Sequence, residues 1–398
     1  MALSRDDNPY MPGFGIVPPA LAGREPEFAD LEAALRRVRR GIYEQPRLLS
    51  GDRGMGKTAV LAELVVEARA NGVWAVDVEA TRTGDALVPL LRDLRRVLVD
   101  HDRDRRIGEY VDRALAVLAA FGIKHGTFEL AVEVEPAAGR GGSGDLATDL
   151  GDVLEAVGET AAQAQTAVLL TVDEIHAMPA GQMGPLFAAL QRSARHEREP
   201  GSHLPVLTVV AGLPHSLGVL RAASSTYAER LRRHDLDLLG DGPVVEALTV
   251  PAEERGVRFT PEALGTLVAA IGGYPYFVQL MGYEAWNAAA DRGARSVIRD
   301  DAAAAGVAAG RRAAAGIYSS RLAEVPDAER RYLDAVADLE PAARRSTQVA
   351  ERLGGTAEQW GWARRRLIER GLLRPDGYGR VAFALPGLEG FLRDRPRD

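Results

Sequence analysis

The hydrophobic residues of this 398-residue chain follow two patterns that alternate along most of its length. Short apolar runs bounded by turn residues predict buried strands. The longer segments between them carry apolar residues every three or four positions, as amphipathic helices do. The predicted strands are residues 47–50, 73–80, 167–173, 205–212 and 244–250. Five apolar strands separated by helices predict an α/β fold in which a parallel sheet is covered by helices on both faces.

The pattern also divides the chain into four parts. Residues 1–22 are rich in Pro and Gly and predict an extended segment, whereas the predicted strands lie within a core of residues 23–250. From residue 251 to about 322 the apolar spacing is wholly helical, and residues 326–398 predict three helices followed by a strand–turn–strand ribbon. Within the core, residues 122–144 combine a stretch of period two with a Gly/Ser/Arg segment, so we expect an excursion from the domain surface there.

The segment between the first predicted strand and the helix after it carries the clearest chemical motif. It reads Gly51-Asp52-Arg53-Gly54-Met55-Gly56-Lys57-Thr58, the phosphate-binding pattern G-x-x-x-x-G-K-[ST]. Glycines let the backbone approach a polyphosphate closely, and the backbone N–H groups and the following helix N-terminus attract the anion. In this pattern Lys57 contacts the β- and γ-phosphates, and the Thr58 hydroxyl contacts Mg²⁺. Lysine occurs only at Lys57 and Lys124, which makes a chance match rare.

The third predicted strand ends in two acidic residues, Asp173 and Glu174. An ATPase needs such groups at a strand end that faces its phosphate loop. Asp173 would hold Mg²⁺ through water, and Glu174 would act as a general base that polarises the attacking water. A strand that merely stops at an acidic turn is the alternative, and the phosphate loop in the same chain favours the catalytic interpretation. We expect His176, just beyond this pair, to make local hydrogen bonds.

Composition narrows the class of protein. The formal net charge is −7, which excludes a globally basic nucleic-acid binder but leaves room for a local basic surface. The chain has no cysteine, so disulfides, thiolate metal sites and cysteine nucleophiles are excluded, and we expect a cytoplasmic location. Residues 1–7 lack the apolar pattern of a signal peptide, and no apolar run reaches about 18 residues, so we expect no membrane span.

Together, the loop at 51–58, the strand ending in Asp173-Glu174, and the helix and strand that follow resemble the AAA+ P-loop ATPases. Gly23-Arg24-Glu25 before the first helix is similar to the branch that contains the origin-recognition ATPases and the related bacterial regulatory, STAND-like ATPases. The resemblance covers most of residues 20–316. It implies a five-stranded sheet of order 5-1-4-3-2, an α-helical lid at 251–322, ATP and Mg²⁺ as ligands, and a C-terminal winged helix-turn-helix.

The resemblance also implies site residues that the chain matches only in part. An arginine finger before the fifth strand, acting on the nucleotide of a neighbouring subunit, would be Arg230, with Arg232 and Arg233 as alternatives. This role requires a homo-oligomer. The tip after the fourth strand, at 211–215, has no Asn or Thr to face the γ-phosphate, and the lid motif at 272–279 has Tyr and Phe where many relatives carry an Arg. These departures favour a slow hydrolase or a nucleotide-dependent switch.

The C-terminal residues predict a domain that binds either DNA or protein. In a winged helix the third helix enters the major groove and the wing lies beside the backbone. The candidate DNA-binding residues are Arg364, Arg365 and Arg366 on the third helix and Arg380 on the wing. Residues 325–398 contain 14 Arg against 12 Asp and Glu, a net charge of about +2 that is modest for a duplex-binding module. A winged helix that docks a protein partner therefore stays open as the alternative.

Two functions follow from these features. The first is an ATP-binding and slowly hydrolysing AAA+ regulator whose nucleotide state controls a winged helix that contacts double-stranded DNA. The alternative is a slow or non-hydrolysing nucleotide-dependent scaffold for signalling or defence, whose winged helix docks a protein partner. Both place ATP or ADP, with Mg²⁺, at the phosphate loop.

Overall fold

The computed structural model describes residues 2–13, 15–82, 84–101, 106–127, 135–199 and 201–395. The chain forms two compact units. The sheet unit comprises Arg24–Gly51 and Lys57–Leu236, and the helical unit comprises Met1–Gly23, Asp52–Gly56 and Asp237–Asp398. The phosphate loop is therefore shared, because its residues 52–56 group with the helical unit while Gly51 and Lys57 group with the sheet unit.

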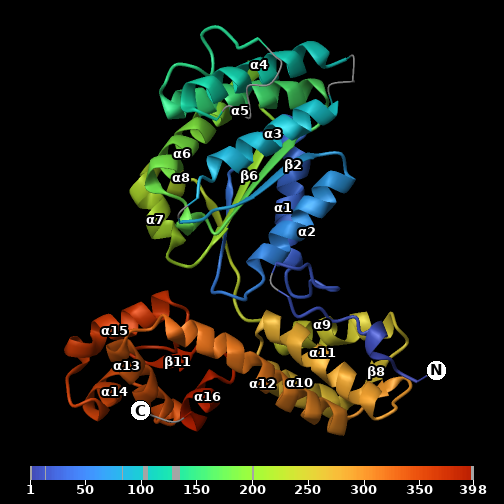
Figure 1. Cartoon of the computed structure of the whole chain (residues 1–398), viewed down its shortest axis with the longest axis vertical. Coiled ribbons are helices and arrows are strands. Elements are labelled where there is room, and N and C mark those ends of the chain that lie inside the picture. Colours follow the sequence, from blue (N-terminus) through green and yellow to red (C-terminus); the bar gives the residue numbers. More distant parts are fainter. Residues whose placement is uncertain are drawn as a thin grey trace. The chain divides into compact units, whose positions relative to one another are not determined.

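The sheet unit contains a five-stranded parallel sheet (Figure 1). Its strands are β1 (Arg47–Ser50), β2 (Trp74–Glu79), β3 (Val168–Asp173), β6 (Val206–Gly212) and β7 (Arg232–Asp235). Their spatial order is β2-β3-β6-β1-β7. Numbered along the chain, this is the order 5-1-4-3-2, so the expected topology is confirmed. The strands β1 and β3 are buried along their whole length, which explains their continuous apolar runs.

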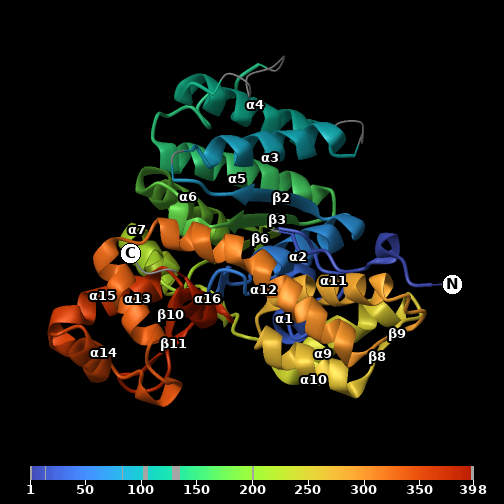
Figure 2. The same ribbon diagram turned by 60° about the horizontal axis from the view of Figure 1, so that its bottom comes forward.

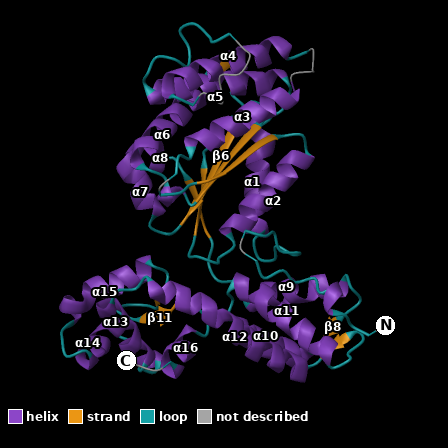
Figure 3. Cartoon of the chain, in the orientation of Figure 1, coloured by secondary structure: helices purple, strands orange, loops and turns teal. Residues whose placement is uncertain are grey.

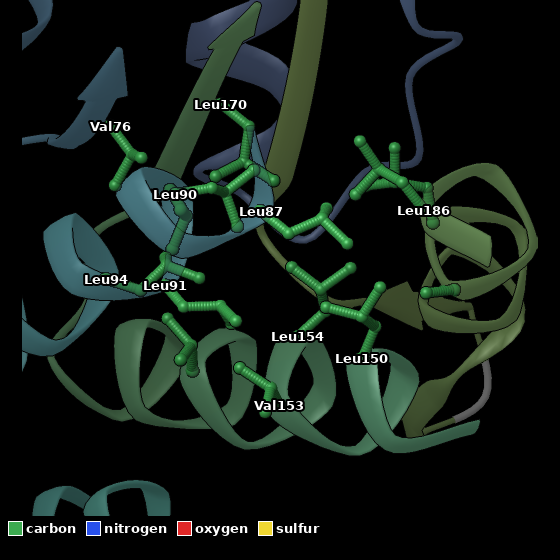
Figure 4. Close-up of a cluster of buried hydrophobic side chains, with 14 of the residues drawn as sticks. Val76, Leu87, Leu90, Leu91, Leu94, Leu150, Val153, Leu154, Leu170 and Leu186 are labelled. Atoms are coloured by element: carbon green, nitrogen blue, oxygen red, sulfur yellow. The ribbon is translucent and has the colours of Figure 1, made fainter. Parts of the chain in front are cut away.

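Helices cover both faces of this sheet (Figure 1). They are α1 (Glu25–Val38), α2 (Lys57–Ala70), α3 (Leu87–His101), α4 (Gly108–His125), α5 (Leu146–Gln163) and α6 (Ala180–Arg195), followed by the short α7 (Ser216–Ala223) and α8 (Ser225–Ala228). A buried cluster joins α3, α5 and α6 to the sheet, and includes Val76, Leu91, Leu154, Leu170 and Leu186 (Figure 4). Burying one such leucine contributes about 1.5–3 kcal/mol, so this cluster is a main source of the unit's stability.

The fifth strand is not where the sequence analysis expected it. Residues 244–250 belong to a helix, α9 (Asp241–Glu253), and the fifth strand is the polar segment β7. The buried residues of α9 are Val244, Ala247, Leu248, Pro251 and Ala252, a spacing typical of one helix face. Because β7 lies at the sheet edge and pairs only with β1, its side chains need not be apolar. Arg232 and His234 of β7 instead bind Asp30 of α1, each at 3.0 Å.

The helical unit contains the helices that were expected to form a lid (Figure 3). They are α9, α10 (Pro261–Ile271), α11 (Pro275–Asp291) and α12 (Asp300–Ala323), with a two-residue parallel pair of β8 (Arg258–Phe259) and β9 (Val297–Ile298). The helical region expected from residue 251 thus begins at Asp241. Gly272 ends α10 in the left-handed region, as a helix-terminating glycine does.

Residues 2–13, part of the segment that the sequence predicted to be extended, lie against α11. The segment contains a short 3₁₀ helix, Arg5–Asp7. The indole Nε1 of Trp286 donates to the carbonyl of Ser4 at 2.8 Å, and the hydroxyl of the buried Tyr10 donates to the carbonyl of Leu248. These bonds make the N-terminal segment part of the helical unit.

The rest of the helical unit is a C-terminal domain of helices and a small ribbon (Figure 2). Its elements are α13 (Asp327–Ala337), α14 (Ser346–Arg352), α15 (Ala357–Glu369), β10 (Leu373–Pro375), β11 (Val381–Phe383) and α16 (Leu388–Asp394). The three helices and the antiparallel ribbon agree with the expected elements. Thr356 and Gln359 form a reciprocal capping box at the start of α15. The last helix, α16, was not anticipated, and its Glu389 binds the buried Arg344 at 2.6 Å.

Part of the expected excursion lies outside the described residues. The stretch of period two expected at 127–135 falls almost wholly on residues 128–134, which the structure does not describe. The residues after it are held by α5, since the buried Asp149 accepts hydrogen bonds from the backbone N–H groups of Ser143 and Gly144. Among the helices of the described ranges, none is long and apolar enough to cross a bilayer.

Candidate functional site

The phosphate loop connects the buried strand β1 to the first residue of α2, Lys57. Gly54 and Gly56 both have positive φ, +86° and +87°, a backbone conformation that favours glycine. The first turn of α2 follows at once, so its unpaired N–H groups and helix dipole lie next to the loop. This strand–loop–helix arrangement is the one that an anion-binding loop requires.

The side chain of Lys57 is buried although it carries a charge. Its residue is only 5% exposed, and Nζ donates to the carbonyl oxygen of Gly51 at 2.8 Å. The ammonium group therefore lies across the loop, beside the residue at which the loop begins. A phosphate bound in the loop would be attracted to the Lys57 ammonium group. This attraction is stronger than in water, because the ammonium group is largely shielded from solvent.

Thr58 and Asp173 meet at the carboxyl end of the sheet. Thr58 Oγ1 donates to Asp173 Oδ2 at 2.6 Å, although the two residues are far apart in the sequence. A hydroxyl and a carboxylate are hard oxygen donors of the kind that Mg²⁺ prefers. In the part of the chain that the structure describes, no group of three or more His, Cys, Asp or Glu could hold a metal ion. The pair fits Mg²⁺ nonetheless, since this ion usually takes one or two protein ligands and completes its shell with water and substrate phosphates.

Glu174 has an unusual backbone conformation directly after β3. Its φ of +49° lies in the left-handed region, which is uncommon for a residue other than glycine. Its backbone N–H donates to Asp173 Oδ1 at 2.7 Å, and this bond ties the two acidic residues together. Strained residues of this kind cluster at functional sites, where the surrounding structure supports them.

One histidine lies beside the Glu174 carboxylate and a second packs against the first, a feature that sequence reasoning largely missed. Glu174 Oε2 is 3.2 Å from Nε2 of His176, whose side chain is 5% exposed. The His215 ring packs edge-on against the His176 ring, with centroids 5.1 Å apart. His215 follows β6 at the tip where the resemblance implies a polar residue facing the γ-phosphate. The sequence could have indicated this residue, because a histidine is also polar and stands at the position where Asn or Thr was sought.

Arg230 lies away from these residues within its own chain. It precedes β7, whose first residue, Arg232, is in register with Arg47 at the amino end of β1. Asp173 lies at the carboxyl end of its strand. Arg230 is exposed and borders a hollow that is also lined by Tyr227. The structure therefore does not bring Arg230 together with the Thr58–Asp173 pair of the same chain.

The lid motif is mostly buried, as its aromatic residues suggested. Pro275 begins α11, and Tyr274 and Phe277 are each 2% exposed. The Tyr274 hydroxyl donates to the carbonyl of Arg53 in the phosphate loop. The motif thus packs as expected and also contacts a loop residue, which the sequence did not indicate.

The four candidate DNA-binding arginines have different surroundings. Arg365 and Arg366 are exposed on α15. Arg364 is half-buried, and its Nε is inaccessible to solvent. Arg380 is also half-buried and binds Asp376 at 3.3 Å. Only two of the four therefore lie on an open helix face.

Two large exposed aromatic residues accompany these arginines and were not singled out from the sequence. Trp362 is 46% exposed and precedes Arg365 and Arg366 by three and four residues, so all three share one face of α15. Tyr378, in the turn between β10 and β11, is fully exposed. The buried residues of α15 are Ala363 and Leu367, and Trp362 lies off their face. A large apolar residue outside the helical spacing of the inner positions was the available signal in the sequence.

Comparisons with known proteins agree with this geometry. Residues 20–209 match the AAA ATPase domain family, and residues 315–392 match a domain of unknown function (DUF8462). A search of curated proteins finds no significant match. The structure is similar to the ORC2 protein of Aeropyrum pernix, solved as ADPNP and ADP complexes, with a TM-score of 0.61 and 14% identity over 96% of both chains.

A second similar structure is a Walker-type ATPase of Pyrococcus abyssi. The TM-score is 0.59 at 14% identity, covering 94% of this chain and 96% of that chain. At such low identity these likenesses show the fold alone. Residues 20–209 therefore match an AAA ATPase domain, and the chain has the fold of the Aeropyrum ORC2 protein and of the Pyrococcus Walker-type ATPase.

Proposed function

We propose that this AAA+ protein binds ATP with Mg²⁺ at its phosphate loop, hydrolyses it slowly, and acts as a nucleotide-dependent regulator. The observation that carries the proposal is the 2.6 Å bond between Thr58 Oγ1 and Asp173 Oδ2. Phosphoryl transfer in P-loop ATPases needs one hydroxyl and one carboxylate beside the metal ion. The chain holds both in contact at the end of the phosphate loop.

Each group has a separate role in the proposed reaction. The loop amides and Lys57 bind the phosphates, while Thr58 and Asp173 hold Mg²⁺, which stabilises the charge on the transferring phosphoryl group. Glu174 orients and polarises the attacking water. His176 keeps the Glu174 carboxylate in place through their 3.2 Å contact. Arg230, at the opposite end of the strands, would act on the nucleotide of a second copy of the chain.

The C-terminal domain is the proposed output of the nucleotide state. We infer a winged helix in which α15 contacts duplex DNA through Arg365 and Arg366, the two candidate arginines that are exposed. Arg364 and Arg380 would support the helix and the wing rather than contact DNA, because each is half-buried. Lysine or arginine contacts to phosphates give affinity that falls steeply with salt, which makes this role measurable.

A specific observation favours the second candidate, a switch that docks a protein partner. The open face of α15 carries Trp362 between Glu358 and Glu369, and tryptophan is enriched at the centres of protein interfaces. Mixed charges around an exposed aromatic residue suit a protein surface better than a duplex. The lid motif, with Tyr274 and Phe277 in place of an arginine, also favours slow or absent turnover.

The nucleotide content of the purified chain separates the two candidates. The protein is denatured, and the released nucleotide is identified and quantified by chromatography. A parallel sample is incubated with labelled ATP and Mg²⁺ to measure exchange and product. Exchange followed by steady release of ADP supports the regulator that hydrolyses ATP. One ADP per chain that does not exchange supports the switch, and a chain that neither carries nor takes up nucleotide contradicts both.

A further inference from the structure

The turn between α10 and α11, residues 272–274, contacts the phosphate loop within the helical unit. The Tyr274 hydroxyl donates to the carbonyl of Arg53. A Cβ added at Gly54 would lie 2.3 Å from this hydroxyl, so the loop backbone passes directly over the tyrosine ring. On the other side of the turn, the N–H of Leu239 donates to the carbonyl of Gly273 at 2.8 Å. The turn is therefore fixed between two backbone segments.

Tyr274 can hold the loop without occupying the phosphate position. In an anion-binding loop the N–H groups face the phosphates, and the carbonyl groups face away from them. The Arg53 carbonyl is one of these carbonyl groups, and Tyr274 supplies its hydrogen-bond donor. Burial raises the pKa of the Tyr274 hydroxyl above its ordinary value, so the group keeps its proton and remains a donor.

A chain of aromatic contacts continues from Tyr274 to the C-terminal domain. The Tyr274 and Phe277 ring centroids are 5.2 Å apart, and Phe277 meets Tyr318 of α12 edge-on at 6.5 Å. Tyr318 then contacts Phe391 of α16 at 5.3 Å. The Tyr318 hydroxyl also donates to the carbonyl of Pro386, just before α16. These spacings lie within the range of direct aromatic pairs.

We propose that Tyr274 is a positioning residue for the phosphate loop, and that the aromatic column Tyr274–Phe277–Tyr318–Phe391 passes the nucleotide state of the loop to the C-terminal domain. This inference rests on the proposed function, since it needs a nucleotide that changes the loop. Phosphate binding orders the loop backbone, and the Arg53 carbonyl moves or stiffens with it. A close-packed column responds by shifting as a unit, because packed interiors do not deform continuously.

The test compares three tyrosine-to-phenylalanine variants of the full chain, each of which removes one hydroxyl and keeps the ring. Tyr274→Phe cuts the bond to the loop, and Tyr318→Phe cuts the bond to Pro386. Tyr10→Phe is the matched control, because Tyr10 is equally buried and its hydroxyl also donates to a carbonyl, that of Leu248, outside the column. The probe is Mg-ADP. Its affinity is measured by calorimetry, and its effect on each segment by hydrogen exchange.

In the wild-type chain, we expect Mg-ADP to slow hydrogen exchange in the loop, in the 272–274 turn and in residues 384–395. Tyr274→Phe should bind Mg-ADP about fivefold more weakly, as the loss of one hydrogen bond implies, and should lose the added protection outside the loop. Tyr318→Phe should bind with wild-type affinity and lose protection only in residues 384–395. Tyr10→Phe should match the wild type in both measurements.

Two results overturn the inference, and they differ from a failure of the proposed function. If Tyr274→Phe keeps wild-type affinity and the wild-type protection pattern, Tyr274 neither positions the loop nor carries its state. If Tyr10→Phe loses protection as Tyr274→Phe does, the effect comes from general loosening of the helical unit. A wild-type chain that binds no ADP at all contradicts the proposed function itself. It also contradicts the proposed coupling between the phosphate loop and the C-terminal domain, which depends on nucleotide binding.

Discussion

The carboxyl end of the sheet and the open face of α15 both contain candidate residues that the sequence indicated, yet only the sheet end becomes a compact site. At the sheet end, Lys57, Thr58 and Asp173 are buried or paired within hydrogen-bond distance. On α15, the arginine run at 364–366 separates, with one side chain half-buried and two exposed. Successive helical residues are rotated by about 100°, so three in a row cannot share a face. A sequence motif therefore forms a site when the spacing of its residues brings their side chains to the same place on the strand, loop or helix that contains them.

The largest expected effect tests the compact site at the carboxyl end of the sheet. Glu174→Gln should leave Mg-ATP binding within about twofold of the wild type and reduce turnover by roughly 10²–10⁴-fold, because the amide keeps the shape but cannot act as a base. Binding is measured by calorimetry, and turnover by phosphate release. A Glu174→Gln chain that hydrolyses ATP at the wild-type rate would remove Glu174 from the catalytic role.

The second largest expected effect tests the open face of α15. The double substitution of Arg365 and Arg366 by Ala should weaken duplex binding on the order of tenfold at moderate salt, and reduce the salt slope of the affinity by about 2. The measurement is DNA binding by fluorescence anisotropy across a salt series. Arg364→Ala is the matched control, since this half-buried residue should leave the slope unchanged. Equal losses from both variants would mean that exposure does not select the DNA-contacting residues.

A smaller effect tests whether the histidine beside Glu174 belongs to the compact site. His176→Ala should lower kcat by roughly five- to tenfold, the equivalent of one lost hydrogen bond, and leave the affinity for Mg-ATP unchanged. His176→Gln retains an N–H donor and should recover part of the rate. Equal kcat values in His176→Ala and the wild type would show that the 3.2 Å contact with Glu174 has no part in turnover.

Much of the fold was predictable because its signals are local. The strands β1, β2, β3 and β6 are apolar and bounded by turns, and the phosphate loop and the Asp173–Glu174 pair follow directly from strand ends. The edge strand β7 was not predictable in this way, because Arg232–Asp235 pairs on one side only and lacks an apolar pattern. The apolar stretch at 244–250 predicted a strand instead, although Val244, Ala247 and Leu248 show the spacing of one helix face.

The contacts that sequence reasoning missed depend on tertiary packing. Nothing near residue 274 in the sequence indicates that Tyr274 bonds to Arg53, since the two are more than two hundred residues apart. The same holds for the N-terminal segment, whose Tyr10 is buried through a bond to Leu248. His215 was overlooked because the family pattern directs attention to Asn or Thr at that tip. Such features become visible only when the chain is folded.

The most direct test of the central claim is ATP turnover by the purified chain with Mg²⁺, with and without duplex DNA, beside a Lys57→Ala control. The account predicts slow turnover that disappears in Lys57→Ala, because the buried ammonium group no longer meets the phosphates. A rate that rises with DNA would support α15 as the output, and a rate indifferent to DNA would favour the protein-docking switch. Turnover that persists unchanged in Lys57→Ala would contradict the claim that the phosphate loop is the catalytic site.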